Sequence, residues 1–302
     1  MTKLFQPCHC ERSVAIVKLS NRTDNAITTQ TSFARNDKRR AFTLAEVLIT
    51  LAIIGVVAAM TIPTLIANYQ QKQTVVKFQK VYSVFKNALE LSRVDNGDYQ
   101  TWTWNHVDGD SSERIEYFLN TYLLPYLKVS KTCFPISEEC FPYLDAQTLQ
   151  GSQIHSITMK DAGFMLSDGT TVWSWSNNSS LFNPHVRFYV DTNGFKKPNV
   201  LGKDIFLLFF TSNPAEISSG KKDENGEFAL KNTFSYPLGL SIYGEGSGLT
   251  LEECLDENTM LGEEAGVNTG SYMACNINSR GELCGLSIKL NNWKIPEGYP
   301  KF

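Results

Sequence analysis

The chain has 302 residues, of which 42% are hydrophobic and 20% charged, so it is long enough for one or two globular domains. Its net charge of −3 does not favour binding to nucleic acids, and we expect no direct nucleic-acid partner. Residues 1–41 hold 8 of the 28 basic and 3 of the 31 acidic residues. The net charge of this segment is therefore +5, and that of the rest of the chain is −8. This asymmetry favours a cytoplasmic N-terminus and an exported body.

Residues 42–66 form an apolar run, FTLAEVLITLAIIGVVAAMTIPTLI, with a single charge at Glu46. As a helix the run is roughly 37 Å long, enough to cross a hydrocarbon core of about 30 Å. We therefore predict a transmembrane helix. A carboxylate is costly inside a bilayer, which suggests a partner for Glu46; alternatively Glu46 stays hydrated at the interface, close to the basic residues 38–40.

The segment KRRAFTLAEVLITLAIIGVVAAMTIP resembles the prepilin cleavage and methylation segment of type IV pilins and type II secretion pseudopilins. Basic residues 38–40 are followed by a small residue, Ala41, and then by Phe42, the first mature residue in this family. Glu46 comes four residues later and precedes the unbroken apolar stretch. The resemblance covers about 50 residues, from Lys38 to the end of the apolar helix.

This resemblance implies that a prepilin peptidase cleaves between Ala41 and Phe42 and methylates the new amino group. Glu46 would then pair with the Phe42 amine of a neighbouring subunit, because an ammonium and a carboxylate that are buried together largely cancel. Gly55 and Pro63 fall where the family has a helix-loosening glycine and proline, and they would let the helix bend during assembly.

Residues 1–41 would be the leader that is removed. Two features depart from the family pattern: Ala41 stands where glycine is usual, and a leader of this length is longer than is common. We interpret the length as a sign of a misassigned translation start.

The helix is expected to continue beyond the bilayer as an amphipathic stalk over residues 67–95. Apolar residues recur there at intervals of three and four. They are Val75, Phe78, Tyr82, Phe85 and Leu89. Asp95-Asn96-Gly97 would stop the helix just after Val94.

Residues 96–302 are expected to form an exported α+β head, in which the stalk helix packs on a small antiparallel sheet. The sequence of residues 163–175 is typical of a β-hairpin that turns at Asp168-Gly169. The sequences of residues 186–190 and 205–210 are typical of buried strands. A helix is predicted from Ser111 or Ser112 to before Pro125, and a capping box at Thr250 should begin a short helix.

The segment 190–204, VDTNGFKKPNVLGKD, is rich in turn residues and connects the two buried strands. It resembles a loop of pseudopilin-like heads, and major pseudopilins bind calcium in this region. Asp191, Asn193, Asn199 and Asp204 are the candidate oxygen ligands, although the spacing is not that of an EF-hand. The alternative is a turn-rich connection without a metal, and no other cofactor is indicated.

Five of the seven cysteines follow the apolar run, where export would favour disulfides. Cys133 and Cys140 enclose a short loop, and Cys275 and Cys284 are similarly close, before a C-terminal segment that resembles the disulfide-clipped tails of pilin-like proteins. This leaves Cys254 as the unpaired residue.

Three readings of function follow. The first is a structural, non-enzymatic subunit of a type IV pilus-like or type II secretion pseudopilus filament. The second is a membrane-anchored protein that binds glycans or surfaces through exposed aromatic side chains. The candidates are the pairs Trp102 and Trp104, and Trp173 and Trp175, and the alternative is that these side chains are buried in the core. The third is a tethered hydrolase, although its histidines, His106, His155 and His185, match no catalytic motif.

The resemblance implies a single-pass protein of the cytoplasmic membrane, with its head in the periplasm or outside the cell and able to enter a filament. Its partners would be the prepilin peptidase, other pilin or pseudopilin subunits and the inner-membrane assembly platform.

Overall fold

The computed structural model describes residues 42–107, 111–137, 139–141, 146–154, 162–177, 185–213, 216–222, 228–262 and 273–301. It divides into two compact units, residues 1–54 and 55–302. In the first unit the described residues are the start of helix α1 (Leu44–Asn96). The predicted leader, residues 1–41, lies outside the described residues.

The predicted long helix is present, and α1 continues through Gly55 and Pro63 to Asn96. It ends where Gly97 takes a φ of +82°, a left-handed conformation that glycine adopts without strain. All five apolar stalk positions predicted from the spacing are buried. By length and composition alone, α1 can also cross a membrane, and no residue of its most apolar window is buried.

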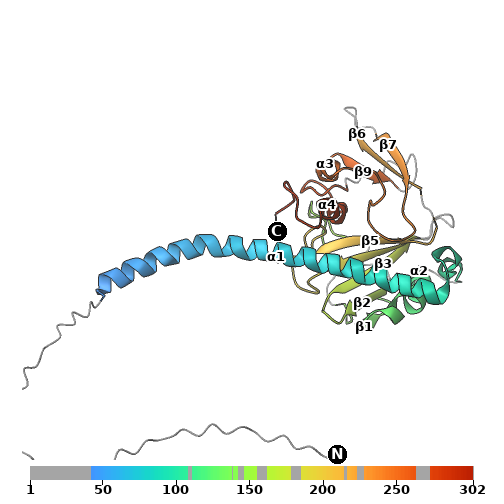
Figure 1. The fold of residues 1–302 in the computed structure, drawn as a ribbon, viewed down its shortest axis with the longest axis horizontal. Coiled ribbons are helices and arrows are strands. Elements are labelled where there is room, and N and C mark those ends of the chain that lie inside the picture. Colours follow the sequence, from blue (N-terminus) through green and yellow to red (C-terminus); the bar gives the residue numbers. More distant parts are fainter. Residues whose placement is uncertain are drawn as a thin grey trace, which may run out of the picture. The chain divides into compact units, whose positions relative to one another are not determined.

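The head contains a six-stranded antiparallel sheet in the order β1-β2-β3-β4-β5-β8 (Figure 1). Its strands are β1 (Val129–Cys133), β2 (Ala162–Leu166), β3 (Thr171–Asn177), β4 (His185–Asp191), β5 (Ile205–Thr211) and β8 (Gly239–Ile242). The predicted hairpin is β2–β3, and the predicted buried strands are β4 and β5. The α+β fold class is therefore confirmed.

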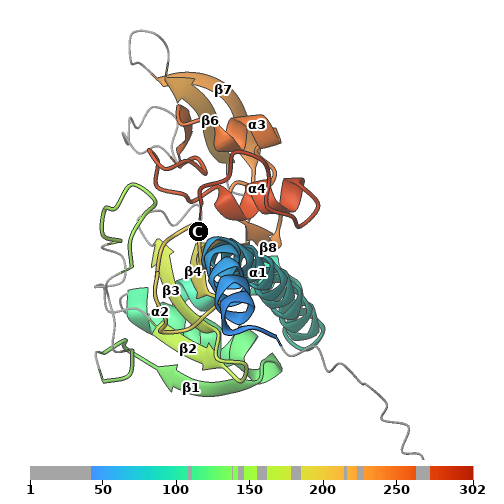
Figure 2. The same cartoon turned by 90° about the vertical axis from the view of Figure 1, so that its left-hand side faces the viewer.

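A second, three-stranded sheet was not predicted. It has the order β7-β6-β9 and is formed by β6 (Glu216–Lys222), β7 (Phe228–Ser235) and β9 (Thr259–Gly262). Two short helices, α3 (Leu251–Leu255) and α4 (Cys284–Leu290), lie between the two sheets (Figure 2). The capping box predicted at Thr250 is formed with Glu253.

The helical region after α1 is broken into short pieces. They are η1 (Tyr99–Thr101), η2 (Trp104–His106), α2 (Ser111–Phe118), the π-helical turn η3 (Leu119–Leu123) and η4 (Leu124–Tyr126). The predicted helix before Pro125 is thus α2 with η3. Trp102 directly follows η1, and Trp104 is the first residue of η2.

Strand β5 is buried on both faces, which explains its unbroken apolar sequence. On one face Phe206 stacks on Phe78 of α1, with ring centroids 4.3 Å apart. On the other face Phe209 stacks on Tyr236 at 4.4 Å. The stalk helix and the C-terminal half of the head therefore share one core through this strand (Figures 1 and 2).

We predict that Phe78→Ala lowers the free energy of unfolding of the head by about 3–5 kcal/mol, because Phe78 is fully buried in this core. Thermal or denaturant unfolding of the full chain in detergent micelles measures the change. The control is Leu91→Ala on the exposed side of the same helix, which should cost less than about 0.5 kcal/mol. Equal effects of the two substitutions would contradict the packing described here.

Candidate assembly segment and adjoining loop

The candidate assembly segment begins with Phe42, whose side chain is 84% exposed. Thr43 caps the N-terminus of α1 and forms a capping box with Glu46. The Glu46 carboxylate accepts hydrogen bonds from the backbone N–H of Thr43 at 2.8 Å and from its hydroxyl at 3.0 Å. In return, the Glu46 N–H donates to the Thr43 hydroxyl at 3.2 Å.

This role of Thr43 was missed from the sequence, although its signal, T-x-x-E before an apolar run, was present. Glu46 therefore has a local partner in the single chain. An intersubunit pairing of Glu46 would compete with this cap or share the carboxylate with it. Ala41, the other residue of the expected cleavage site, lies outside the described residues.

Gly55 and Pro63 both lie within α1 and do not interrupt it. A Cβ added at Gly55 would meet nothing within 4 Å, so no contact with a described residue requires glycine there. Pro63 lacks a backbone N–H and leaves one helical carbonyl without its usual donor. Bending of the helix at these two residues during assembly stays a prediction.

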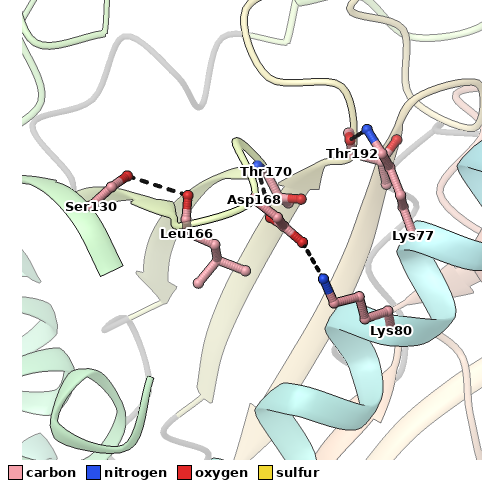
Figure 3. A network of polar contacts seen from close by, with 7 residues as sticks. All are labelled: Lys77, Lys80, Ser130, Leu166, Asp168, Thr170 and Thr192. Atoms are coloured by element: carbon pink, nitrogen blue, oxygen red, sulfur yellow. Dashed lines mark hydrogen bonds and ion pairs between the residues drawn. The ribbon is translucent and has the colours of Figure 1, made fainter. Parts of the chain in front are cut away.

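Two lysines on one face of α1 tie the helix to turns of the sheet (Figure 3). Lys77 donates to the Thr192 carbonyl at 2.9 Å, and Lys80 pairs with Asp168 in the β2–β3 turn at 2.8 Å. Burial opposes ionisation of Asp168, but hydrogen bonds from Lys80 and from Thr170 outweigh it and lower its pKa. Both lysines therefore fix α1 at the same end of the sheet.

The β4–β5 loop, residues 192–204, is organised around the buried carboxylate of Asp204. That carboxylate accepts hydrogen bonds from the N–H groups of Asn199 at 2.8 Å and Val200 at 2.7 Å, and from the Asn193 amide at 2.9 Å. Asp191 in turn accepts from the Asn193 N–H at 3.0 Å. Burial raises the pKa of Asp204 in spite of these donors.

The four candidate calcium ligands thus lie in this loop or, for Asp191, directly before it. The carboxylates of Asp191 and Asp204 accept hydrogen bonds from the loop, whereas the buried side-chain oxygens of Asn193 and Asn199 accept none from the described residues. A calcium ion needs six to eight oxygens, and Asp204 would have to give up hydrogen bonds to provide two of them. Among the described residues no group of three or more His, Cys, Asp and Glu is placed to hold a metal. Calcium binding by this loop stays a prediction of the sequence.

The cysteines are joined as Cys133–Cys140 and Cys275–Cys284, with Cα–Cα distances of 6.1 and 4.5 Å. The first bridge closes a loop at the end of β1, and the second holds the start of α4. Cys254 is the free, buried thiol, and burial raises its pKa to about 12.

The aromatic and histidine candidates are mostly core residues. Trp102, Trp104 and Trp173 are each at most 3% exposed, so their rings offer no binding surface. The side chain of Trp175 and all of His155 lie outside the described residues. His185 is buried on β4 and stacks on Phe209 at 4.4 Å, whereas His106 is exposed in η2.

We predict that Asp204→Asn destabilises the head by about 1–3 kcal/mol, because one oxygen becomes an NH₂ group that faces backbone donors. Thermal unfolding of the full chain in micelles measures the loss. Asp98→Asn, at a carboxylate that is 83% exposed, is the control and should change stability little. If Asp204→Asn were as stable as the parent chain, Asp204 would not organise this loop.

Comparison with known proteins identifies two regions of the chain. A model described as "Family of unknown function (DUF6613)" matches residues 64–233, more than half of the chain. A model described as "Prokaryotic N-terminal methylation motif" matches residues 36–62. The second match contains Phe42, Glu46 and Gly55.

Each of the following similar proteins aligns over about a fifth of this chain. Type II secretion system core protein G of Escherichia coli (strain K12) is 37% identical over 68 residues, 22% of this chain and 44% of that protein. The protein of the same name from Klebsiella pneumoniae is 33% identical over 67 residues, 21% and 45% of the two chains. Prepilin peptidase-dependent protein D of Escherichia coli (strain K12) is 31% identical over 65 residues, 22% and 44%.

The chain thus spans less than half the length of these relatives, and no solved structure matches it. The model of unknown function covers the second part of α1 and much of the head. By these matches and its α+β fold, the chain belongs to the family of unknown function DUF6613 and is a pilin-like protein with a prokaryotic N-terminal methylation motif.

Proposed function

We propose that this protein is a structural subunit of a type IV pilus-like or type II secretion pseudopilus filament. The observation that carries the proposal is an apolar helix start in which no residue of the most apolar window is buried. It is matched by the methylation motif and has one acid four residues after Phe42. A helix with an apolar surface on all sides needs either lipid or other helices around it. A filament core of packed N-terminal helices satisfies that need after the membrane does.

In this proposal a prepilin peptidase removes residues 1–41 and methylates Phe42, and an inner-membrane platform assembles the mature subunits. The protein would span the cytoplasmic membrane once, with its acidic head on the outer side, before extraction into the filament. Glu46 would then pair with the Phe42 amine of a neighbouring subunit, which sets the axial register between the two helices.

The glycan-binding alternative loses its main support, because three of the four tryptophans on which it depended are described and are buried. The pilin-like homology points to a structural subunit without an enzymatic activity. The filament is therefore the single function we propose.

Processing gives the first test. We expect protein from its native host to begin at an N-methylated Phe42, as read by mass spectrometry of the N-terminal peptide. A substitution that makes the residue before the cut large, Ala41→Leu, should block processing and serves as the control. A chain that begins upstream of Phe42, or after the apolar run, would contradict the proposal.

Assembly gives the second test, through Glu46→Gln. Glutamine can still accept the hydrogen bonds of the Thr43 cap, so this substitution removes the charge and keeps the cap. We expect the yield of sheared filaments to fall by roughly tenfold or more, because an unpaired ammonium of Phe42 would be left in the filament core. Membrane insertion of the subunit should not change.

Two controls separate charge pairing from other effects. Glu116→Gln removes one negative charge from an exposed position of the head and should leave filament yield unchanged. Thr43→Ala removes the cap and keeps the carboxylate, so it should reduce the yield far less than Glu46→Gln. Normal filaments from Glu46→Gln would show that the carboxylate charge does not set the register.

A further inference from the structure

An apolar groove of about 480 Å³ lies between α1 and the segment that follows α4. On the helix side it is lined by Val76, which is 63% exposed, and on the other side by Trp293 and Ile295. The ring of Trp293 packs on Phe78 and Tyr82, with both centroids 5.8 Å away. The core therefore fixes the shape of the groove, while its wall at Val76 stays open to a partner.

Two lysines line the same groove, and no acid does. Lys72 comes from α1 and Lys294 from the C-terminal segment, and both are exposed. Within the part of the chain that the structure describes, neither lysine forms an ion pair with a carboxylate. An apolar groove that carries two such cations is complementary to a protruding apolar side chain with a carboxylate beside it.

The head presents such a side chain at Ile277. Of the large hydrophobic side chains described after α1, this one is the most exposed, at 64%, against 38–43% for Tyr117, Leu238 and Leu290. An isolated exposed isoleucine is ordinary on a protein surface. The way in which the chain holds Ile277 and the charge next to it give this one its significance.

The turn that carries Ile277 is tied to the end of α3 by the side chains on either side of it. The Asn276 amide donates to the Leu255 carbonyl at 3.4 Å, and the Asn278 amide donates to the Glu257 carboxylate at 2.6 Å. These bonds place a carboxylate beside the exposed isoleucine and hold the two in one arrangement. A partner that binds this turn therefore orders little additional chain.

The charge around this turn is negative. Glu257 is exposed, and Asp256 precedes it. The basic residue that follows the turn, Arg280, pairs with Glu282 at 2.8 Å, so its charge is balanced locally. The tip of the turn thus combines an apolar side chain with an acid, which is the complement of the lysine-lined groove.

We propose that the Ile277 turn of one copy docks into the groove of a second copy, with Glu257 facing Lys72 and Lys294. The turn and the groove share no residue, so every copy carries both halves of the contact. A contact between two different surfaces of one chain repeats from copy to copy and forms a filament when its rotation does not close a ring. The inference rests on the proposed function, because it names a contact between the heads of filament subunits.

A carbodiimide cross-linker tests the contact, because it joins a carboxylate directly to an amine only where the two touch. Full-length protein is cross-linked on cells of its native host and separated into monomer and dimer on a denaturing gel. We expect the dimer, and not the monomer, to contain a peptide that joins Glu257 to Lys72 or Lys294.

Two substitutions of exposed apolar residues test the anchor. Ile277→Ser should reduce the cross-linked dimer roughly tenfold, because it removes the side chain that fills the groove. Leu238→Ser, at a position that is 43% exposed, is the matched control and should leave the dimer unchanged. Thermal unfolding in micelles checks that both variants are folded.

Exchange of the charges gives a second readout. Glu257→Lys alone, or Lys72→Glu with Lys294→Glu, lacks a carboxylate–amine pair at the contact and should give no dimer. The three substitutions together recreate the pair with its charges exchanged and should restore the dimer. Only residues that face each other across the contact predict this rescue.

The control for the exchange changes the same charges at other exposed positions. It combines Glu116→Lys with Lys86→Glu and Lys128→Glu, none of which lies in the turn or the groove. This triple variant should keep the dimer that joins Glu257 to the groove lysines.

Several results would overturn the inference. One is a Glu257–lysine link in the monomer without such a dimer, which would place the contact within one chain. Another is a dimer that Ile277→Ser leaves unchanged, or a charge exchange that restores nothing. A link from the groove lysines to Glu46 of a second copy would identify the N-terminal helix as the occupant, and a link to a different protein would identify another partner.

The yield of sheared filaments separates this inference from the filament proposal. Normal filaments without the Glu257–lysine dimer would refute the docking contact alone. The dimer in a chain that begins upstream of Phe42 and forms no filaments would refute the filament proposal and leave the contact standing. Absence of both the filaments and the dimer would refute both.

Discussion

Burial of one face of α1 against the six-stranded sheet is the contact on which the rest of this structure depends. Phe78 stacks on Phe206, and Phe85 packs on Phe164 and Phe188 with centroids 6.0 and 5.6 Å apart. These contacts confine the amphipathic half of the helix to the head. Among the described residues, no side chain buries the most apolar window of the helix before it. One helix therefore couples a stable soluble core to a surface that needs lipid or other subunits.

The end of the head nearest the apolar half is held by polar contacts as well as by packing. Lys77 and Lys80 connect α1 to two turns, and these turns meet where Gly194 lies against the Gly169 carbonyl. A Cβ at Gly194 would lie 2.7 Å from that oxygen, and its φ of +72° also favours glycine. Asp204 holds the adjoining part of the β4–β5 loop by accepting hydrogen bonds from the N–H groups of Asn199 and Val200.

Glu46 links the local and the intersubunit levels. In the single chain its carboxylate completes the cap of α1 with Thr43, which satisfies donors that would otherwise be exposed at the helix start. In a filament the same carboxylate would lie near the amine of a neighbour, where a charge without a partner is costly. The cap gives Glu46 a partner in the single chain, and in the proposed filament the amine of a neighbouring subunit would give it a stronger one.

The sequence by itself determined the features that depend on neighbours along the chain. The apolar run, the five stalk positions from Val75 to Leu89, the hairpin turn at Asp168-Gly169, the buried strands β4 and β5, and the cap at Thr250 all follow from local periodicity and turn chemistry. Only the tertiary structure decided the second sheet, the burial of Trp102 and Trp104 beside 3₁₀ turns, and the bonding of Asp204 to its own loop. The tertiary structure also brought Lys77 close to Lys196 and Lys197, which follow it in the chain by more than a hundred residues. These features depend on contacts between distant segments, and local patterns carry no information about which segments meet.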